Sequence, residues 1–330
     1  MHAPDFWRRR NWRERRIGDA LTPLGWLYSA AVALKAARTK VHHASVPVIC
    51  VGNLTAGGTG KTPVSIAIAR MLGAHGHNPF FVTRGYGGKL TGPLRVMAEH
   101  RAADVGDEPL LLADTAPTIV ARVRAAGAGL ATALGAGVIV MDDGHQHFSL
   151  HKDLSLVVID TAQQFGNGRV LPAGPLRERV KQGLKRADAV ILVGDTDVDL
   201  PHLLPHFTGP VLRAHIRASD NPELSGARMF GFAGIGLPEK FFRSLEAAGA
   251  ILAGAKCFAD HHTYSAAEIA SLKATARDRG AQLITTAKDY VRLTPDQRDG
   301  IRVLPVEAEF DDPASLERLI GGLWPEQKAS

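Results

Sequence analysis

Cysteine, tyrosine and tryptophan are scarce in this 330-residue chain, which contains two, four and four of them respectively. The two cysteines, Cys50 and Cys257, lie far apart in the sequence and form no CxxC pair. Disulfide-stapled domains and structural zinc sites need more numerous and more closely spaced cysteines, so both classes are excluded. We expect a reduced, cytosolic compartment.

The chain also lacks a hydrophobic run long enough to span a bilayer. The apolar stretch from Leu21 to Leu34 is shorter than the roughly 20 residues that a transmembrane helix needs, and Pro23 and Gly25 interrupt it. The first 20 residues are too rich in charge for a secretory signal peptide. We therefore expect neither a spanning helix nor a cleaved leader.

The excess of positive charge is confined to the N-terminal region. The chain has 39 Lys and Arg against 33 Asp and Glu, a net charge of +6. Residues 1–45 contain nine of the basic and three of the acidic residues, so residues 46–330 carry 30 of each sign and are neutral. A nucleic-acid-binding protein usually spreads basic residues over a face of its folded body, so nucleic acid is not expected as a partner.

The same N-terminal region is rich in aromatic residues, and three of the four tryptophans, Trp7, Trp12 and Trp26, lie in it. Tryptophan and tyrosine favour the headgroup level of a membrane, and arginine attracts anionic lipid. We therefore predict an amphipathic helix that lies on an anionic membrane surface. The alternative is a helix that packs its apolar face on the body of the protein and leaves its arginines in water.

Beyond residue 45, short β-branched runs alternate with helical patterns, which is typical of an α/β fold with a parallel sheet. Strands are predicted at 46–52, 79–83, 117–121, 137–141, 154–160 and 188–194. Helices are predicted at 62–75, 107–115, 122–134 and 175–186. Because the strands are almost continuously apolar, helices should cover both faces of the sheet.

A second, smaller α/β lobe is predicted after a linker at 195–209 that is rich in proline and histidine. Its predicted strands are 210–216, 227–233, 281–286 and 301–306, and its predicted helices are 238–248, 265–279 and 312–323. The sequence thus indicates an N-terminal helix region (1–45), a nucleotide-binding and catalytic domain (46–200) and a second lobe (201–330) that contributes to the active-site cleft.

The strongest local signal is VPVICVGNLTAGGTGKTPVSIAIARML, in which a buried strand leads through a glycine-rich loop into a helix. This is the setting of a P-loop, where backbone N–H groups surround phosphate oxygens, a lysine reaches the β- and γ-phosphates and a hydroxyl binds Mg²⁺. The standard P-loop pattern has glycine where this chain has Thr55. The alternative to a P-loop is a glycine-rich turn that is merely flexible. The predicted nucleotide-binding residues are Thr55, Ala56, Gly57, Gly58, Thr59, Gly60, Lys61 and Thr62.

Two adjacent carboxylates, Asp142 and Asp143, follow the predicted strand 137–141. Ligands of open α/β sheets bind outside the carboxyl ends of the strands, so one of these carboxylates is placed to bind Mg²⁺ together with Thr62. The alternative is a pair of capping residues at a turn. With the P-loop, the pair predicts binding of a nucleoside triphosphate.

At this point the sequence resembles the tetraacyldisaccharide 4'-kinase family, the lipid A 4'-kinases, over almost the whole chain. The resemblance rests on eight segments that occur in the family's order: VGNLTAGGTGKTP, TRGYGG, GDEPLLLA, MDDGHQH, LPAGPLRE, FAGIGLPEKFF, FADHHTYS and TTAKDYVRL. His145 and His262 are small departures from the family's pattern.

The resemblance implies that the γ-phosphate of ATP is transferred to the 4'-hydroxyl of tetraacyldisaccharide 1-phosphate, giving lipid IVA. It implies ATP and Mg²⁺ as cofactors and a peripheral or monotopic location on the cytoplasmic face of the bacterial inner membrane. No obligate protein partner is indicated. A P-loop chain allows two other function classes. One is an ATPase or switch that acts on a membrane partner, and the other is a nucleic-acid translocase with a basic arm.

The resemblance points to Asp107 and His261 as a cooperating catalytic pair. A carboxylate can orient an imidazole and fix its tautomer, and the imidazole can keep the carboxylate ionised. Without the resemblance, Asp107 reads as a helix cap and His261 as an ordinary surface or core histidine.

Further charged residues in these segments are candidates for metal or phosphate contacts. Glu108 and Glu178 are candidate Mg²⁺ or water-shell ligands, or else ordinary acids at helix starts. Arginine offers phosphate a two-pronged donor, which makes the cations of the set candidate phosphate contacts, with surface ion pairs as the alternative. These cations are Arg84, Arg177 and Lys288.

Overall fold

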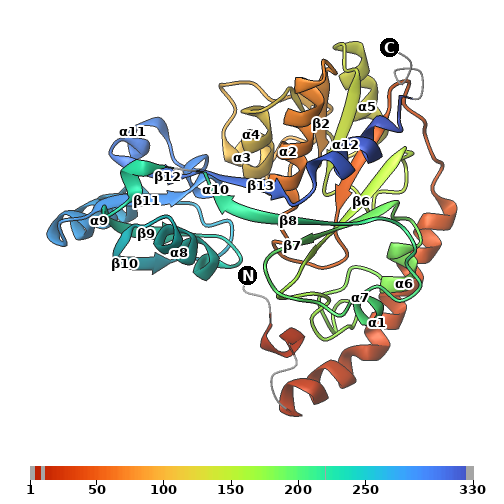
Figure 1. Cartoon of the computed structure of the whole chain (residues 1–330), viewed down its shortest axis with the longest axis horizontal. Helices are drawn as coiled ribbons and strands as arrows, with labels where there is room; N and C mark the ends of the chain where they lie inside the picture. Colours follow the sequence, from red (N-terminus) through yellow and green to blue (C-terminus); the bar gives the residue numbers. More distant parts are fainter. Residues whose placement is uncertain (1–3, 9–11, 220, 325–330) are drawn as a thin grey trace.

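The computed structural model describes residues 4–8, 12–219 and 221–324, which form two lobes that lie side by side (Figure 1). Within these residues the chain forms one nine-stranded sheet and one four-stranded sheet. The larger sheet builds the larger lobe, and the N-terminal helix lies on its side away from the smaller lobe, at the lower right of Figure 1.

The larger sheet is parallel except at its two edges. Its strand order is β13-β8-β7-β6-β1-β5-β2-β4-β3, and only the pairs β13–β8 and β3–β4 are antiparallel among the described strands. The strands are β1 (Val48–Gly52), β2 (Pro79–Thr83), β3 (Leu94–Arg95), β4 (Thr118–Val120), β5 (Val138–Asp142), β6 (Leu154–Asp160), β7 (Ala189–Val193), β8 (Val211–Ala218) and β13 (Val306–Phe310).

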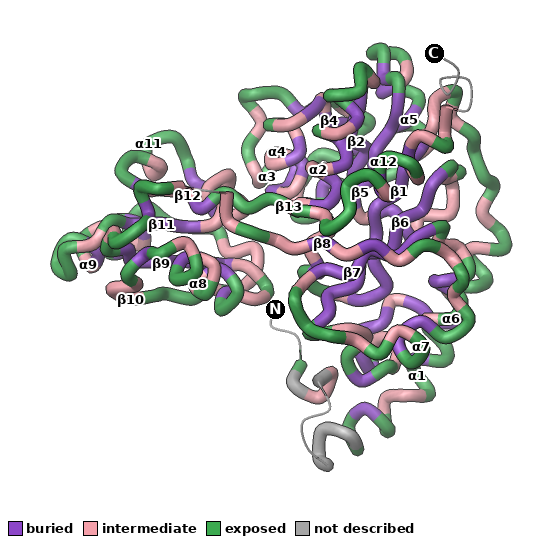
Figure 2. Tube along the Cα trace, in the orientation of Figure 1, coloured by how far each residue is buried: buried purple, intermediate pink, exposed green. Residues whose placement is uncertain are grey.

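Helices cover both faces of this sheet, as the apolar strands predict (Figure 2). Ile49 and Val51 of β1 pack with α2 and α12, whereas Val48 and Cys50 face the other side and pack with α5. The helices of this lobe are α2 (Lys61–Ala74), α3 (Ala102–Val105), α4 (Asp107–Ala113), α5 (Arg124–Ala133), α6 (Val180–Leu184), α7 (Leu200–Leu203) and α12 (Pro313–Gly321).

The smaller lobe is a parallel sheet with helices on both faces. Its strands, in the order β10-β9-β11-β12, are β9 (Arg228–Ala233), β10 (Ile251–Cys257), β11 (Gln282–Thr286) and β12 (Ile301–Leu304). Separate apolar clusters join the sheet to α8 on one face and to α9 on the other. The remaining elements are η2 (Pro222–Leu224), α8 (Pro238–Ala247), α9 (Ala266–Asp278), α10 (Ala287–Tyr290) and α11 (Pro295–Arg298).

The division between the lobes differs from the predicted boundary at residue 200. β8 pairs with β7, β13 pairs with β8, and α12 packs on the same core, so these parts of 201–330 belong to the larger lobe. The smaller lobe is therefore an excursion of the chain between two neighbouring strands. The prediction failed here because strand register and helix period say nothing about which sheet a strand joins.

Two local predictions also differ from the structure, and one strand of the smaller lobe was not predicted. The predicted helix 175–186 is helical only in α6, because residues 175–177 bond instead to the phosphate loop. The predicted strand 301–306 is split between β12 and β13. The strand β10 was missed, because this half-exposed edge strand, ILAGAKC, lacks a β-branched run.

The N-terminal region forms η1 (Asp5–Arg8) and one long helix, α1 (Trp12–Arg38). Gly25 and Ser29 lie against the larger lobe, and a side chain at Gly25 would meet the carbonyl oxygen of Val170. No helix in the described part of the chain is both long and apolar enough to cross a membrane. Several of the predicted membrane contacts lie outside what the structure describes. These are Arg9 and Arg10, together with the side chains of Arg8, Trp12, Arg13 and Arg15.

Candidate active site

The phosphate loop connects the end of β1 to the start of α2. Gly57 and Gly60 have φ angles of +118° and +87°, in the left-handed region that glycine adopts without steric cost. Among the described residues no side chain caps α2, so the N–H groups of its first turn are left to a ligand or to solvent. A helix N-terminus of this kind, preceded by a glycine-rich loop, is a ready site for phosphate.

Thr55 departs from the standard loop pattern without disturbing the loop. It is buried and forms an antiparallel bridge with Leu176, and the adjacent Ala56 N–H donates to Pro175 O over 2.7 Å. Thr55 is not among the described residues with positive φ. Because its backbone is held by residues 175–176, position 55 does not need the freedom of glycine.

Asp142 ends β5 directly beside β1 and faces the first turn of α2. Its carboxylate accepts hydrogen bonds from Thr62 Oγ1 over 3.1 Å and from Ser65 Oγ over 2.8 Å. Burial, together with the nearby charge of Glu108, raises the pKa of Asp142 well above its usual value. The positive charge around this buried carboxylate is therefore too small to offset its burial.

Asp143, by contrast, is surrounded by cations. Arg177 Nη1 donates to its two carboxylate oxygens over 2.8 and 3.0 Å, and Lys61 Nζ lies 3.7 Å from Oδ1. Burial opposes ionisation, but the charges of Lys61 and Arg177 prevail and lower the pKa of Asp143 to about 2. The loop lysine is thus held at the phosphate loop by a carboxylate that it shares with Arg177.

The oxygen donors at this edge of the sheet suit Mg²⁺. Hydroxyl and carboxylate oxygens are its preferred protein ligands, and Thr62, Asp142 and the neighbouring Glu108 provide them. Within the described residues no cluster of three or more acidic, histidine or cysteine side chains forms a complete cage. Mg²⁺ usually keeps several waters and binds through one or two carboxylates and the substrate phosphates, so such a cage is not required.

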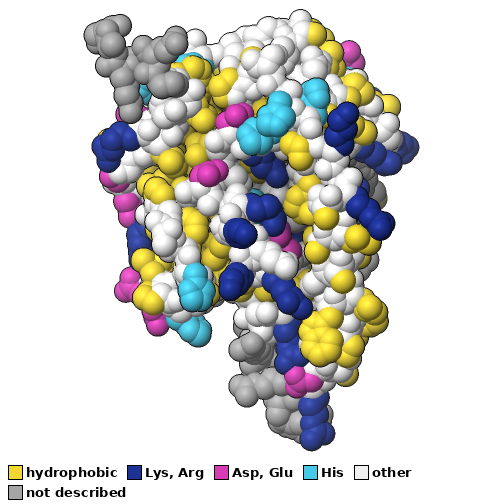
Figure 3. Space-filling view, turned by 90° about the vertical axis from the view of Figure 1, so that its right-hand side faces the viewer, with side chains coloured by type: hydrophobic (Ala, Val, Ile, Leu, Met, Phe, Trp, Pro, Cys, Tyr) yellow, Lys and Arg dark blue, Asp and Glu magenta, His cyan; other side chains and the backbone are white. Residues whose placement is uncertain are grey.

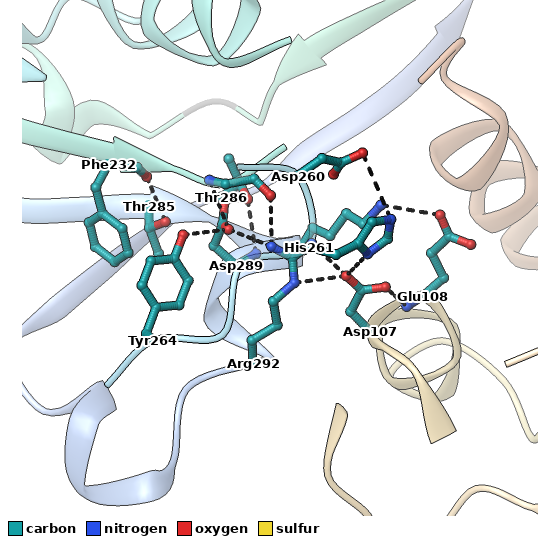
Figure 4. A network of polar contacts seen from close by, with 12 residues as sticks. Asp107, Glu108, Phe232, Asp260, His261, Tyr264, Thr285, Thr286, Asp289 and Arg292 are labelled. Atoms are coloured by element: carbon teal, nitrogen blue, oxygen red, sulfur yellow. Dashed lines mark hydrogen bonds and ion pairs between the residues drawn. The ribbon is translucent and has the colours of Figure 1, made fainter. Parts of the chain in front are cut away.

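Asp107 and His261 come together from different lobes, as Figure 4 shows. Asp107 begins α4 in the larger lobe, and His261 lies in the turn after β10 of the smaller lobe; His261 Nδ1 is 2.9 Å from Asp107 Oδ2. Burial alone would raise the pKa of Asp107. The hydrogen bond from His261 and the charges of Lys288 and Arg292 outweigh burial and hold this pKa far below its usual value.

Other ion pairs join the lobes around this contact. Lys288 Nζ lies 3.3 Å from Glu108 Oε1, and burial of Lys288 is outweighed by the charges of Glu108 and Asp107, which raise its pKa. Lys240 of α8 binds Asp160, the last residue of β6. Each pair sets a cation of the smaller lobe against a carboxylate at the same edge of the larger sheet.

Two of the predicted contacts are placed differently from the rest. Glu178 is buried, forms an ion pair with Arg186 and also accepts a hydrogen bond from Gln146. Its carboxylate therefore stabilises the packing behind the phosphate loop. Arg84 is exposed and directly follows β2. It is therefore positioned at the same sheet edge, but facing solvent.

The sequence interpretation missed Arg292, Asp289 and Tyr264, although all three lie within segments that carry the family resemblance. Arg292 donates through Nε to Asp107 over 2.8 Å and through Nη1 to Asp289, which in turn accepts a hydrogen bond from Tyr264. The segments TTAKDYVRL and FADHHTYS pointed to this region. Lys288 and His261 were singled out from these segments, but the roles of Arg292, Asp289 and Tyr264 become visible only from their three-dimensional contacts.

A family model described as tetraacyldisaccharide-1-P 4'-kinase matches residues 17–323. The chain belongs to this family. A relative named tetraacyldisaccharide 4'-kinase in Paramagnetospirillum magneticum is 49% identical over 97% of this chain and 98% of its own length. One of the same name in Rhodospirillum rubrum is 47% identical over 98% of each chain.

A solved structure of the same family has this fold. It is described as the "apo" form of LpxK from Aquifex aeolicus in complex with ATP, and it matches with a TM-score of 0.74 at 25% identity. The match covers 93% of this chain and 99% of that one. The family resemblance and the predicted class, a P-loop-type parallel sheet flanked by helices, are confirmed.

In this kinase-family chain, Lys61→Ala should lower kcat by about 10²-fold or more, since one preorganised donor to developing charge typically contributes that much. The fold should survive, because Asp143 keeps Arg177 as its partner. Phosphate transfer from radiolabelled ATP measures the effect. Arg70→Ala, on the same helix but in an exposed pair with Glu307, is the control and should leave kcat unchanged. Activity near wild type in Lys61→Ala would contradict the nucleotide site.

Proposed function

We propose that this chain transfers the γ-phosphate of ATP to the 4'-hydroxyl of tetraacyldisaccharide 1-phosphate, giving lipid IVA, and that Asp107 and His261 act on that hydroxyl. The observation that carries the proposal is the contact of 2.9 Å between His261 and Asp107, at the sheet edge where the phosphate loop lies. The names of the relatives support the acceptor, and the Aquifex aeolicus protein, whose structure is described as a complex with ATP, supports the phosphate donor.

The pair can accept the proton of the sugar hydroxyl. With its Nδ1–H donating to Asp107, neutral His261 carries a lone pair on Nε2, which Asp107 does not contact and which lies 3.8 Å from Asp260 Oδ2. Asp107 fixes this tautomer and balances the imidazolium that forms when the proton arrives. Phosphoryl transfer otherwise depends on positioning and on stabilising charge, which is the task of the phosphate loop.

The residues from Thr55 to Thr62 are proposed to bind the ATP phosphates, with Lys61 at the β- and γ-phosphates. Thr62 and Asp142, with Asp143 and Glu108 close by, are proposed to hold Mg²⁺. The ion would neutralise charge that develops on the phosphate oxygens. Arg177, Arg84 and Lys288 are proposed to attract phosphate through their positive charge. For Glu178, its pairing with Arg186 favours a structural role over direct ligation.

The N-terminal helix is proposed to hold the enzyme on an anionic membrane surface, on the cytoplasmic face of the inner membrane, where its acylated substrate resides. Large apolar side chains of α1 face solvent, with Trp26 61% and Leu27 68% exposed. A groove of about 330 Å³ beside them is lined by Trp26, Arg169 and Arg179, among others. Figure 3 shows Lys and Arg side chains gathered beside hydrophobic ones on one face of the molecule. Apolar burial and basic charge are the two signals of interfacial binding.

Mass spectrometry of a detergent-dispersed tetraacyldisaccharide 1-phosphate, incubated with the protein, ATP and Mg²⁺, tests the reaction directly. The lipid should gain the mass of one phosphate. Without the lipid, the protein should consume almost no ATP. Rapid hydrolysis of ATP without lipid, and no phosphorylated product, would instead favour a P-loop ATPase or switch.

Asp107→Ala and His261→Ala should each lower kcat far more than they change the KM for ATP, because both act on the acceptor hydroxyl. If the two side chains work as one unit, the double variant should be little slower than the slower single variant. Steady-state kinetics at saturating lipid measures this. Losses that multiply in the double variant would show that the two residues act independently.

Replacing the six N-terminal arginines with Gln should weaken binding to anionic vesicles and make the remaining binding less sensitive to salt. Each basic residue near such a surface contributes about 1 kcal/mol, although a cluster contributes less than the sum. The substitutions are at Arg8, Arg9, Arg10, Arg13, Arg15 and Arg16.

Substitution of Trp7, Trp12 and Trp26 by Ala should weaken vesicle binding in a salt-independent way, because that contribution is apolar burial. Flotation at low and high salt measures both variants. Lys256→Gln with Arg277→Gln, exposed on the smaller lobe, is the control. Flotation of the arginine variant like the parent at both salt concentrations would mean that α1 is only a packing element.

A further inference from the structure

Arg292 reaches across from the smaller lobe and contacts Asp107 with two of its nitrogen atoms. Nε donates to Asp107 Oδ2 over 2.8 Å, and Nη2 donates to the same oxygen. The two side chains are 5% and 4% exposed, so the pair is buried between the lobes. The other oxygen, Oδ1, accepts from the backbone N–H of Glu108, so the carboxylate is held at both ends.

The remaining nitrogen of the guanidinium fastens Arg292 to its own lobe. Nη1 donates to Asp289 Oδ1 over 2.8 Å and to Gly234 O over 2.7 Å. Asp289 is fully buried and also accepts from Tyr264 Oη, Gly234 N and Thr286 Oγ1. Burial and the charge of Asp289 raise the pKa of Tyr264, which keeps its hydroxyl protonated and donating.

The same scaffold also fixes His261. The backbone N–H of His261 donates to Gly234 O over 3.1 Å, which is the carbonyl that Arg292 Nη1 reaches. His261 has a φ of +59°, an unusual conformation for a residue with a side chain, which persists only where neighbouring contacts determine it. Gly234 therefore links the position of the imidazole to that of the guanidinium.

We propose that Arg292 is a positioning residue that aligns Asp107 with His261, through its two donors to Asp107 and its shared anchor at Asp289 and Gly234. This inference rests on the proposed function of the Asp107–His261 pair. Lysine cannot replace Arg292 fully, because a single ammonium nitrogen cannot span Asp107, Asp289 and Gly234 in the geometry of the planar fork.

Arg292→Met should lower kcat by about 10²-fold, the scale that a misplacement of about 1 Å at a reacting group produces. The KM for ATP should stay within roughly twofold, because the contacts of Arg292 are with Asp107 and its own lobe rather than with the phosphate loop. Arg292→Lys should recover part of the loss. Arg298→Met is the matched control: Arg298 packs on Tyr290 in the same segment and bonds to backbone carbonyls there.

The decisive comparison uses Asp107→Ala as a background. If Arg292 acts through Asp107, adding Arg292→Met to Asp107→Ala should lower kcat by no more than roughly threefold, as expected for residues that act as one unit. An equal loss in both backgrounds overturns the proposal, as does an Arg292→Met enzyme with wild-type kcat. If Arg292→Met does not fold, Arg292→Lys alone and with Asp107→Ala provides the same comparison.

The outcomes separate this inference from the function on which it rests. Near wild-type activity in Asp107→Ala would refute the proposed catalytic pair itself. A strong loss in Asp107→Ala together with full activity in Arg292→Met would leave the pair in place and refute only the role of Arg292. Equal losses in Arg292→Met and Arg298→Met would indicate general loosening of the segment and would also refute it.

Discussion

The carboxylate of Asp107 is almost completely withdrawn from water, and its side-chain partners come from the opposite lobe. A buried charge without partners is costly, because the protein interior does not solvate it as water does. His261, Arg292 and Lys288 offset that cost only when the smaller lobe faces the larger one in the observed way. The placement of the lobes and the ionisation of the site thus depend on the same contacts.

The chain connectivity makes this placement possible. The smaller lobe leaves the larger sheet after β8 and returns at β13, and these two strands are paired along β13. The two chain connections between the lobes therefore both start from one antiparallel edge of the larger sheet, rather than from a single flexible linker. The excursion carries Lys240, His261, Lys288 and Arg292 to the edge where the parallel strands of the larger lobe end.

At that edge the charges are divided between two tasks. Asp143 is neutralised by Lys61 and Arg177, so these cations are held in place before any phosphate arrives. Asp142 has hydroxyl partners and a neighbouring carboxylate instead, and its raised pKa reflects a deficit of positive charge. The two adjacent aspartates have similar sequence surroundings, but β5 ends between them and Asp143 adopts a φ of +53°. Their opposite environments follow from that turn in the backbone.

The sequence by itself determined the parts of this protein that are local. Short segments encode the apolar strands, the glycine-rich loop between Gly52 and Lys61, and the acidic residues after β5. Each of these features depends on the residue types within a few positions of one another, so it can be read from the sequence. The pairing of Asp107 with His261 came only from resemblance to a family. Tertiary structure alone decided that β8 and β13 join the larger sheet, that Glu178 is taken up by Arg186, and that Arg292 clamps Asp107. The contact between Arg292 and Asp107 joins residues 185 positions apart, and its strength comes from burial between packed surfaces, which no local pattern of residues records.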